Sequence, residues 1–248
     1  MTWTDLVAAL PAVSLEALNE EAALQTRVDR KYVVDAQTWA HVLTEHAASL
    51  QALDVSGSRA AQYRSLYYDT PEMASYLAAA RKRPRRFKVR VREYVDSGTS
   101  AVEVKLRSAR GATVKHRQFV EGTPSVDEVV AFAASFPLVA PYASELAASL
   151  ETTYTRTTLL HPQGRITIDA GVTAVDASAS ERDSMDYGEL LIVETKCTGA
   201  AGDIDRALWS RGIRPVRLSK YATSLAALHP NLPANRWHRT LSRHVAAA

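Results

Sequence analysis

The strongest chemical signal in the sequence is a run of cations at Arg81–Tyr94, RKRPRRFKVRVREY. Eight of the first twelve residues of this run are lysine or arginine. From residue 86 onward, the cations alternate with Phe87, Val89 and Val91. Successive side chains of a strand point to opposite faces, so the run predicts one strand with a cationic face and an apolar face.

The same alternation with a period of two recurs in seven other segments. In each, charged or polar residues occupy one parity, and valine, isoleucine, leucine or phenylalanine occupies the other. We therefore predict eight strands, at residues 27–34, 62–68, 86–94, 101–107, 113–120, 152–160, 165–172 and 189–196. The short connections within 86–120 are typical of antiparallel hairpins.

Helices are predicted between these strands. Asp35 is placed to cap one helix, and the Asp69-Thr70-Pro71 turn is placed to cap another. The expected helical segments are 3–24, broken at Pro11, then 35–50, 73–80, 125–150, broken at Pro137 and Pro141, 203–210 and 220–228.

The predicted charged face carries many cations and few acids. The cations are Arg27, Lys31, Lys88, Arg90, Arg92, Lys105, Arg107, Lys115, Arg117, Arg156, Arg165 and Lys196, and the acids are Asp29, Glu103, Asp169 and Glu194. Arginine makes forked contacts with phosphate, and lysine supplies a point charge. Carboxylates beside such cations can hold Mg²⁺ or Mn²⁺ that bridges to phosphate oxygens. The alternative, salt bridges that only neutralise one another, leaves the excess of cations unexplained.

Eight two-faced strands can form either a sandwich or a barrel. A sandwich would leave the charged faces in water, whereas a closed barrel would turn them inward and cover its apolar outside with helices. We therefore expect an α+β fold, an eight-stranded antiparallel β-barrel with a charged lumen and helices packed on the outside.

Composition limits the class of protein. The chain has 248 residues, a net charge of +3 and a pI near 9.0, so its cations are concentrated locally, and that favours an anionic ligand. Acids on the same face would repel nucleic acid, so no nucleic-acid partner is expected. Cys197 is the only cysteine, and neither a signal peptide nor a membrane span is predicted. We expect a cytoplasmic protein.

Six blocks of the sequence, in order, resemble one known family. They are RVDRKYVV, YRSLYYDT with KVRVREY, AVEVKLR with VKHRQ, YTRTTL with RITID, LIVETK, and LSKY. In type and order they resemble the VTC domain, the polyphosphate-polymerase-like branch of the triphosphate tunnel metalloenzymes. The resemblance implies an eight-stranded tunnel that holds a nucleoside triphosphate or polyphosphate together with a divalent metal.

The resemblance also implies roles for individual residues. Lys31, the pair Arg90 and Arg92, and Lys220 of the Ser-Lys-Tyr motif would contact the reacting phosphates. Glu194 would bind the metal, with Asp29, Glu103 and Asp169 as further candidates. The remaining phosphate contacts would come from Lys88, Lys105, Lys115, Arg117, Arg156, Arg165 and Lys196. Arg27 departs from the Glu-x-Glu-x-Lys signature of the wider superfamily, which argues against a two-metal site there.

The expected activity is metal-dependent transfer of the ATP γ-phosphoryl group to a growing polyphosphate, with Mn²⁺ or Mg²⁺ as cofactor. Two alternatives use the same fold: a tripolyphosphatase or nucleoside triphosphatase, and a non-catalytic sensor of polyphosphate or inositol phosphates. The expected partners are ATP, tripolyphosphate or polyphosphate, and the oligomeric state is not predicted. We expect an N-terminal helical segment at 1–24, the VTC-like domain at 25–228 and a basic tail at 229–248.

Overall fold

The computed structural model describes residues 1–23, 27–109, 111, 113–179 and 182–245. The boundary expected between residues 24 and 25 lies outside the described residues, and so does the side chain of Arg27. The described chain forms two compact units. Unit 1 comprises residues 1–61, 154–172 and 187–217, and unit 2 comprises residues 62–153, 173–186 and 218–248. Two long strands, β8 (Ala147–His161) and β9 (Gly164–Asp176), run through both units.

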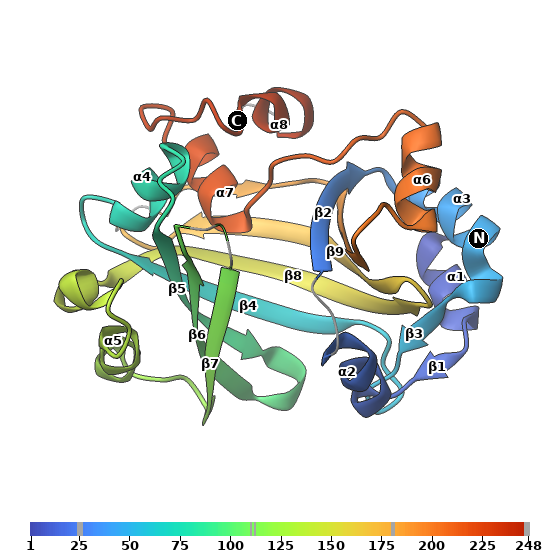
Figure 1. Ribbon diagram of the computed structural model, residues 1–248, viewed down its shortest axis with the longest axis horizontal. Helices are drawn as coiled ribbons and strands as arrows, with labels where there is room; N and C mark the ends of the chain where they lie inside the picture. Colours follow the sequence, from blue (N-terminus) through green and yellow to red (C-terminus); the bar gives the residue numbers. More distant parts are fainter. Residues whose placement is uncertain (24–26, 110, 112, 180–181, 246–248) are drawn as a thin grey trace. The chain divides into compact units, whose positions relative to one another are not determined.

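Unit 1 contains β2 (Arg27–Val34) and β11 (Leu191–Thr198), which pair antiparallel with each other, and β11 also pairs with β9. Its helices are α1 (Trp3–Ala9), α2 (Leu15–Ala23), α3 (Ala36–His46) and α6 (Asp203–Ser210). Figure 1 shows α1, α3 and α6 close to one another. The short elements are β1 (Ala12–Val13), the 3₁₀ turn Ala47–Ser49 and β3 (Gln51–Leu53).

The core of unit 1 lies between these helices and one face of the strands. Tyr32 and Val34 of β2 and Ile166 and Ile168 of β9 are buried there, against Trp39 and neighbouring residues of α3. Gly164 is required at the β8–β9 turn because its φ is +142° and an added Cβ would lie 2.0 Å from the Lys196 carbonyl oxygen. In unit 1, the alternate residues that the sequence predicted to be apolar therefore face the helices.

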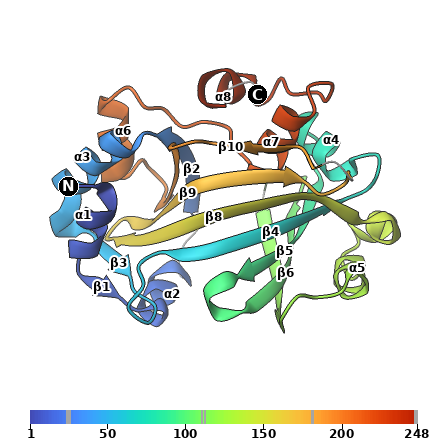
Figure 2. The ribbon, with the colours of Figure 1, turned by 180° about the vertical axis from the view of Figure 1, so that it is seen from behind.

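Unit 2 contains four consecutive antiparallel strands (Figures 1 and 2). They are β4 (Ala61–Asp69), β5 (Arg86–Tyr94), β6 (Thr99–Arg107) and β7 (Thr113–Glu121). The helix α5 (Val126–Ala134) and the 3₁₀ segment Ala140–Glu145 follow β7, and the 3₁₀ turn Val95–Ser97 joins β5 to β6. Val129 and Ala133 of α5 pack against the apolar face of β5 and β6.

A second core of unit 2 joins α4 (Ala74–Ala80), α7 (Lys220–Leu228) and α8 (His238–His244), with the short strand β10 (Ser184–Asp186) beside them. Asp69 holds the start of α4, because its buried carboxylate accepts the backbone N–H groups of Ser75 and Tyr76 at 2.8 and 2.9 Å. Trp237 is buried in this core, so the described part of the C-terminal segment is docked.

Most predicted elements are confirmed, including the helices at 203–210 and 220–228 and the break at Pro11. The helical assignment of residues 147–150 is wrong, because β8 begins at Ala147, where pairing with neighbouring strands outweighs the helical composition. The strand order is β2-β11-β9-β8-β4-β5-β6-β7, with β1, β3 and β10 attached at the side. The described residues therefore form a sheet of 11 strands instead of eight. Among the described residues, β2 and β7 are the two ends of this order, so the expected closure into a barrel is not seen.

Candidate functional site

The charged face of unit 2 is built in rows across β5, β6 and β7, because residues directly opposite in antiparallel strands share a face. One row is Lys88, Lys105 and Lys115, and the next is Arg90, Glu103 and Arg117. At one end of the face, Arg86 lies opposite Arg107. Phe87, Val89 and Val91 are buried on the opposite face, which confirms the predicted alternation.

Glu103 is the counter-ion at the centre of this face. Its carboxylate is 2% exposed and accepts Arg90 Nε at 2.7 Å, Arg117 Nε at 2.9 Å and Lys115 Nζ at 3.2 Å. Burial alone would raise the pKa of Glu103, but Arg90, Arg92 and Lys115 lower it well below the usual glutamate value. Glu103 is therefore an ionised acid held by cations on both neighbouring strands.

The row of three lysines has no acid within it, and like charges directly opposite one another destabilise a sheet. Lys88 Nζ donates to Ser219 Oγ at 2.6 Å, immediately before Lys220 at the start of α7. Burial lowers the pKa of Lys115 to about 8, although Glu103 partly opposes this shift. A bound polyanion would relieve the repulsion in this row.

Arg90 and Arg92 of β5 each also contact an aromatic ring of β4. The Arg90 guanidinium lies 5.8 Å from the centre of the Tyr67 ring, and the Arg92 guanidinium lies 5.3 Å from that of Tyr63. Arg92 is 7% exposed. Ring contacts of this kind hold a guanidinium in a fixed plane, as forked recognition of an oxyanion requires.

The charged face of unit 1 is built in the same way from β2, β11 and β9. Glu194 lies opposite Lys31 on β2 and Thr167 on β9, and Lys196 lies opposite Asp29 and Arg165. Lys196 Nζ is 3.4 Å and Lys31 Nζ 4.0 Å from the Glu194 carboxylate. The pKa of Glu194 would rise through burial, but Lys31, Lys196 and Arg156 lower it well below the usual value.

Asp169 is the second well-buried acid of this face. Arg156 donates to it through Nε at 2.6 Å and Nη2 at 2.8 Å, a forked pair. The negative charge of Asp169 opposes the lowering of the Glu194 pKa, so the two carboxylates act on one another. Asp29, by contrast, is exposed.

The structure thus groups the predicted residues into two sets, one in each unit. Unit 1 contains Lys31, Arg156, Arg165, Lys196, Asp29, Asp169 and Glu194, and unit 2 contains Lys88, Arg90, Arg92, Lys105, Lys115, Arg117, Lys220 and Glu103. That both sets line a single lumen remains a prediction.

The acids of these faces are the candidate ligands for a divalent metal ion. Within residues 1–23, 27–109, 111, 113–179 and 182–245, no group of three or more His, Cys, Asp or Glu could hold a metal ion. Mg²⁺ is commonly held by one or two carboxylates together with substrate phosphates. Glu194 and Asp169 fit that arrangement, and the buried hydroxyl of Thr167, opposite Glu194, has no hydrogen-bond partner in the described structure.

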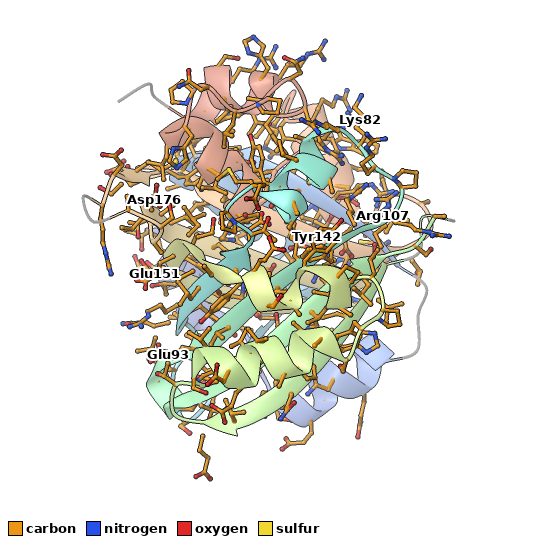
Figure 3. All side chains as sticks on the ribbon, turned by 90° about the vertical axis from the view of Figure 1, so that its left-hand side faces the viewer. Lys82, Glu93, Arg107, Tyr142, Glu151 and Asp176 are labelled. Atoms are coloured by element: carbon orange, nitrogen blue, oxygen red, sulfur yellow. The ribbon has the colours of Figure 1, made fainter. Side chains whose placement is uncertain are left out.

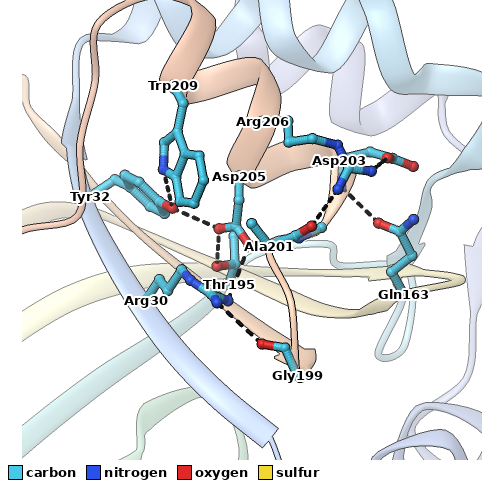
Figure 4. Close-up of polar contacts among 11 residues, drawn as sticks. Arg30, Tyr32, Gln163, Thr195, Gly199, Ala201, Asp203, Asp205, Arg206 and Trp209 are labelled. Carbon is cyan, nitrogen blue, oxygen red and sulfur yellow. Dashed lines mark hydrogen bonds and ion pairs between the residues drawn. The ribbon is translucent and has the colours of Figure 1, made fainter.

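A buried network on the other side of β2 was not found from the sequence (Figure 4). Asp205 of α6 accepts the Tyr32 hydroxyl at 2.7 Å and the Thr195 hydroxyl at 2.6 Å, and Trp209 donates to Tyr32 at 3.0 Å. The network fastens α6 to the back of β2 and β11, the strands that carry Lys31 and Glu194. No spacing in the sequence connects Asp205 with Tyr32.

Residues 26–131 and 138–229 match the VTC domain family. The match covers well over half of the chain, so the chain belongs to the VTC domain family, as its six sequence blocks predicted. No helix in the described part of the chain is long and apolar enough to span a membrane.

A search of curated proteins finds no match to the chain. Among solved structures, a proposed adenylate cyclase from Bacillus halodurans is 14% identical, with a TM-score of 0.46, and 79% of this chain and 94% of that one are covered. A proposed adenylyl cyclase from Hippeastrum, which has a dominant triphosphatase activity, is 13% identical, with a TM-score of 0.48 over 85% of this chain and 100% of that one. A third, a proposed adenylate cyclase from Vibrio parahaemolyticus, is 12% identical, with a TM-score of 0.46 over 79% of this chain and 95% of that one.

Proposed function

We propose that this protein binds a nucleoside triphosphate and transfers the γ-phosphoryl group of ATP to a growing polyphosphate, with Mg²⁺ or Mn²⁺ as cofactor. The observation that carries the proposal is the row of Lys88, Lys105 and Lys115 beside Arg90, Glu103 and Arg117. Five cations and one acid on adjacent rows favour a polyanionic ligand over mutual neutralisation. Membership of the VTC domain family supports the same class of ligand.

Transfer to polyphosphate is favoured over hydrolysis by the cations that continue the unit 2 face beyond the lysine row. Beyond the lysine row lie Arg86 and Arg107, directly opposite one another, and the exposed cations of residues 81–85. In Figure 3, Lys82 and Arg107 lie on one side of unit 2, and the acids Glu93 and Glu151 lie on the other. The rows at Arg86, Lys88 and Arg90 of β5 are separated by two intervals of two residues each. The cations therefore extend over about 14 Å along the strand. A water acceptor needs no such extension, whereas a polyphosphate acceptor does.

Catalysis in this proposal consists of positioning and charge neutralisation, since phosphoryl transfer asks for little covalent chemistry from the protein. The arginines would hold phosphate oxygens by forked hydrogen bonds, and the lysines would neutralise the chain. Glu194, with Asp169, would hold the divalent cation. When bound, that cation would neutralise charge on the phosphate oxygens.

The test is to incubate the purified protein with ATP and either Mn²⁺ or Mg²⁺ and to resolve the products. The proposal predicts metal-dependent polyphosphate that lengthens with time. Free phosphate as the only product would favour the triphosphatase alternative. Tight binding of polyphosphate without turnover of ATP would favour the sensor alternative.

A further inference from the structure

One end of the unit 2 face changes from cations to aromatic side chains. Next to the row of Arg90, Glu103 and Arg117 comes a row in which Arg92, Ala101 and Phe119 lie opposite one another. Beyond it, Tyr63 lies opposite Tyr94. By strand register these residues share the face that carries the cations. Aromatic residues therefore continue the candidate phosphate-binding face directly, within one unit.

The three aromatic rings contact one another. Tyr63 and Tyr94 meet edge to face with ring centres 5.3 Å apart, and the ring centres of Tyr94 and Phe119 are 6.2 Å apart at an interplanar angle of 35°. The Arg92 guanidinium lies over Tyr63 and that of Arg117 lies 5.2 Å from the centre of Phe119. The rings are thus held in fixed positions beside two cations.

Phe119 is the exposed member of this cluster. It is 59% exposed, whereas Phe87 on the apolar face is 4% exposed. Packing of the sheet explains the Tyr63–Tyr94 contact, but it does not explain why a phenyl ring is left in water beside a cationic row. An exposed ring next to cations has the two components that bind a nucleotide: a stacking surface and charge for its phosphates.

We infer that Phe119, supported by Tyr94, is a stacking platform for the base of the nucleoside triphosphate. The phosphates then extend from Arg92 and Arg117 towards the lysine row, which leaves the end at Arg86 and Arg107 for the acceptor. This inference rests on the proposed function and deepens it, because it predicts that ATP is bound better than tripolyphosphate. Every base has a π face, so stacking alone predicts similar binding of ATP and GTP.

The test compares Mg²⁺–ATP with Mg²⁺–tripolyphosphate, titrated calorimetrically into wild-type protein, Phe119→Ala and Phe119→Trp. Phe119→Ala is expected to weaken ATP binding about tenfold, the size of one lost base–aromatic stack, and to leave tripolyphosphate binding unchanged. Phe119→Trp is expected to retain ATP binding. The matched control is Val114→Ala, which truncates another exposed apolar residue of β7 on the opposite face and is expected to bind both ligands as the wild type does.

Four outcomes would overturn the inference. If wild-type protein binds tripolyphosphate but binds ATP no better, or if Phe119→Ala weakens both ligands equally, the platform is wrong while the proposed function stands. If wild-type protein binds neither ligand, the proposed function fails and the platform fails with it. If Phe119→Ala changes the oligomeric state in light scattering but not the affinity ratio, Phe119 contacts a second copy of the chain instead.

Discussion

At the scale of single residues, three acids on the charged faces are already paired with cations. Glu103 contacts Arg90, Lys115 and Arg117, Asp169 contacts Arg156, and Glu194 contacts Lys31 and Lys196. The sequence predicted which residues share a face, because parity alone decides that. It did not predict which cation each acid contacts, since that depends on strand register, and a slip of one residue reverses every face.

Glu194 is predicted to matter for metal binding. Glu194→Gln keeps the shape of the side chain but removes the charge that a hard cation needs. We expect Mn²⁺ affinity in the presence of tripolyphosphate to fall by about tenfold or more, as for other losses at metal sites. Calorimetry measures this, with Glu93→Gln as the control, because Glu93 pairs with Arg64 on the opposite face of β5. Equal Mn²⁺ affinity in both variants would show that Glu194 is not a metal ligand.

Lys115 is predicted to make tripolyphosphate binding depend on pH. Its pKa is lowered to about 8, so the side chain is mostly charged at pH 7 and mostly neutral at pH 9. Affinity should therefore fall between pH 7 and pH 9, by about fivefold for the loss of roughly 1 kcal/mol at a partly exposed cation. Lys115→Arg stays charged and should remove this fall. Because tripolyphosphate itself titrates, the wild-type affinity is divided by the Lys115→Arg affinity at each pH, which cancels that effect. A ratio that does not change with pH would contradict the role of Lys115.

At the scale of elements, the charge alternation was sufficient to locate eight strands, and capping residues located α3 and α4. Asp35 accepts the backbone N–H of Thr38 at 2.7 Å, as a helix N-cap should. The short strands β1, β3 and β10 could not be predicted, because two or three residues carry no periodicity and pair only through their neighbours. Pairing with neighbouring strands also explains residues 147–150, which are strand despite a helical composition.

Asp69 is predicted to contribute more to the free energy of unfolding than an exposed helix-capping residue does. Asp69→Ala removes the acceptor for the N–H groups of Ser75 and Tyr76 and leaves the buried Tyr221 hydroxyl without its carboxylate partner. We expect a loss of about 2–4 kcal/mol in the free energy of unfolding, measured in urea. Ser125→Ala, in the exposed capping box of α5, should cost about 1 kcal/mol. Equal losses in the two variants would show that burial of Asp69 adds nothing.

At the scale of the whole molecule, the chain belongs to the VTC domain family, and each of its two units presents one charged face. The order of the sequence blocks was enough to identify the family. The strand order was not predictable, because it depends on pairing between strands far apart in the chain. Neither was the aromatic end of the unit 2 face, since Tyr63, Tyr94 and Phe119 come from three strands and meet only through register.

The face of unit 2 is proposed to recognise a triphosphate by geometry and not by charge alone. Calorimetric titration of tripolyphosphate into Arg90→Lys and Arg92→Lys, at low and moderate salt, tests it most directly. Arg64→Lys is the control, because Arg64 pairs with Glu93 and Glu151 on another face. Lysine keeps the charge but not the fork, and a charge-assisted hydrogen bond is worth roughly 1.5–3 kcal/mol. Affinities for tripolyphosphate should be about tenfold or more below wild type in both variants at both salts. Wild-type affinity in both variants, with a steep loss as salt is raised, would contradict it and indicate a generic cationic surface.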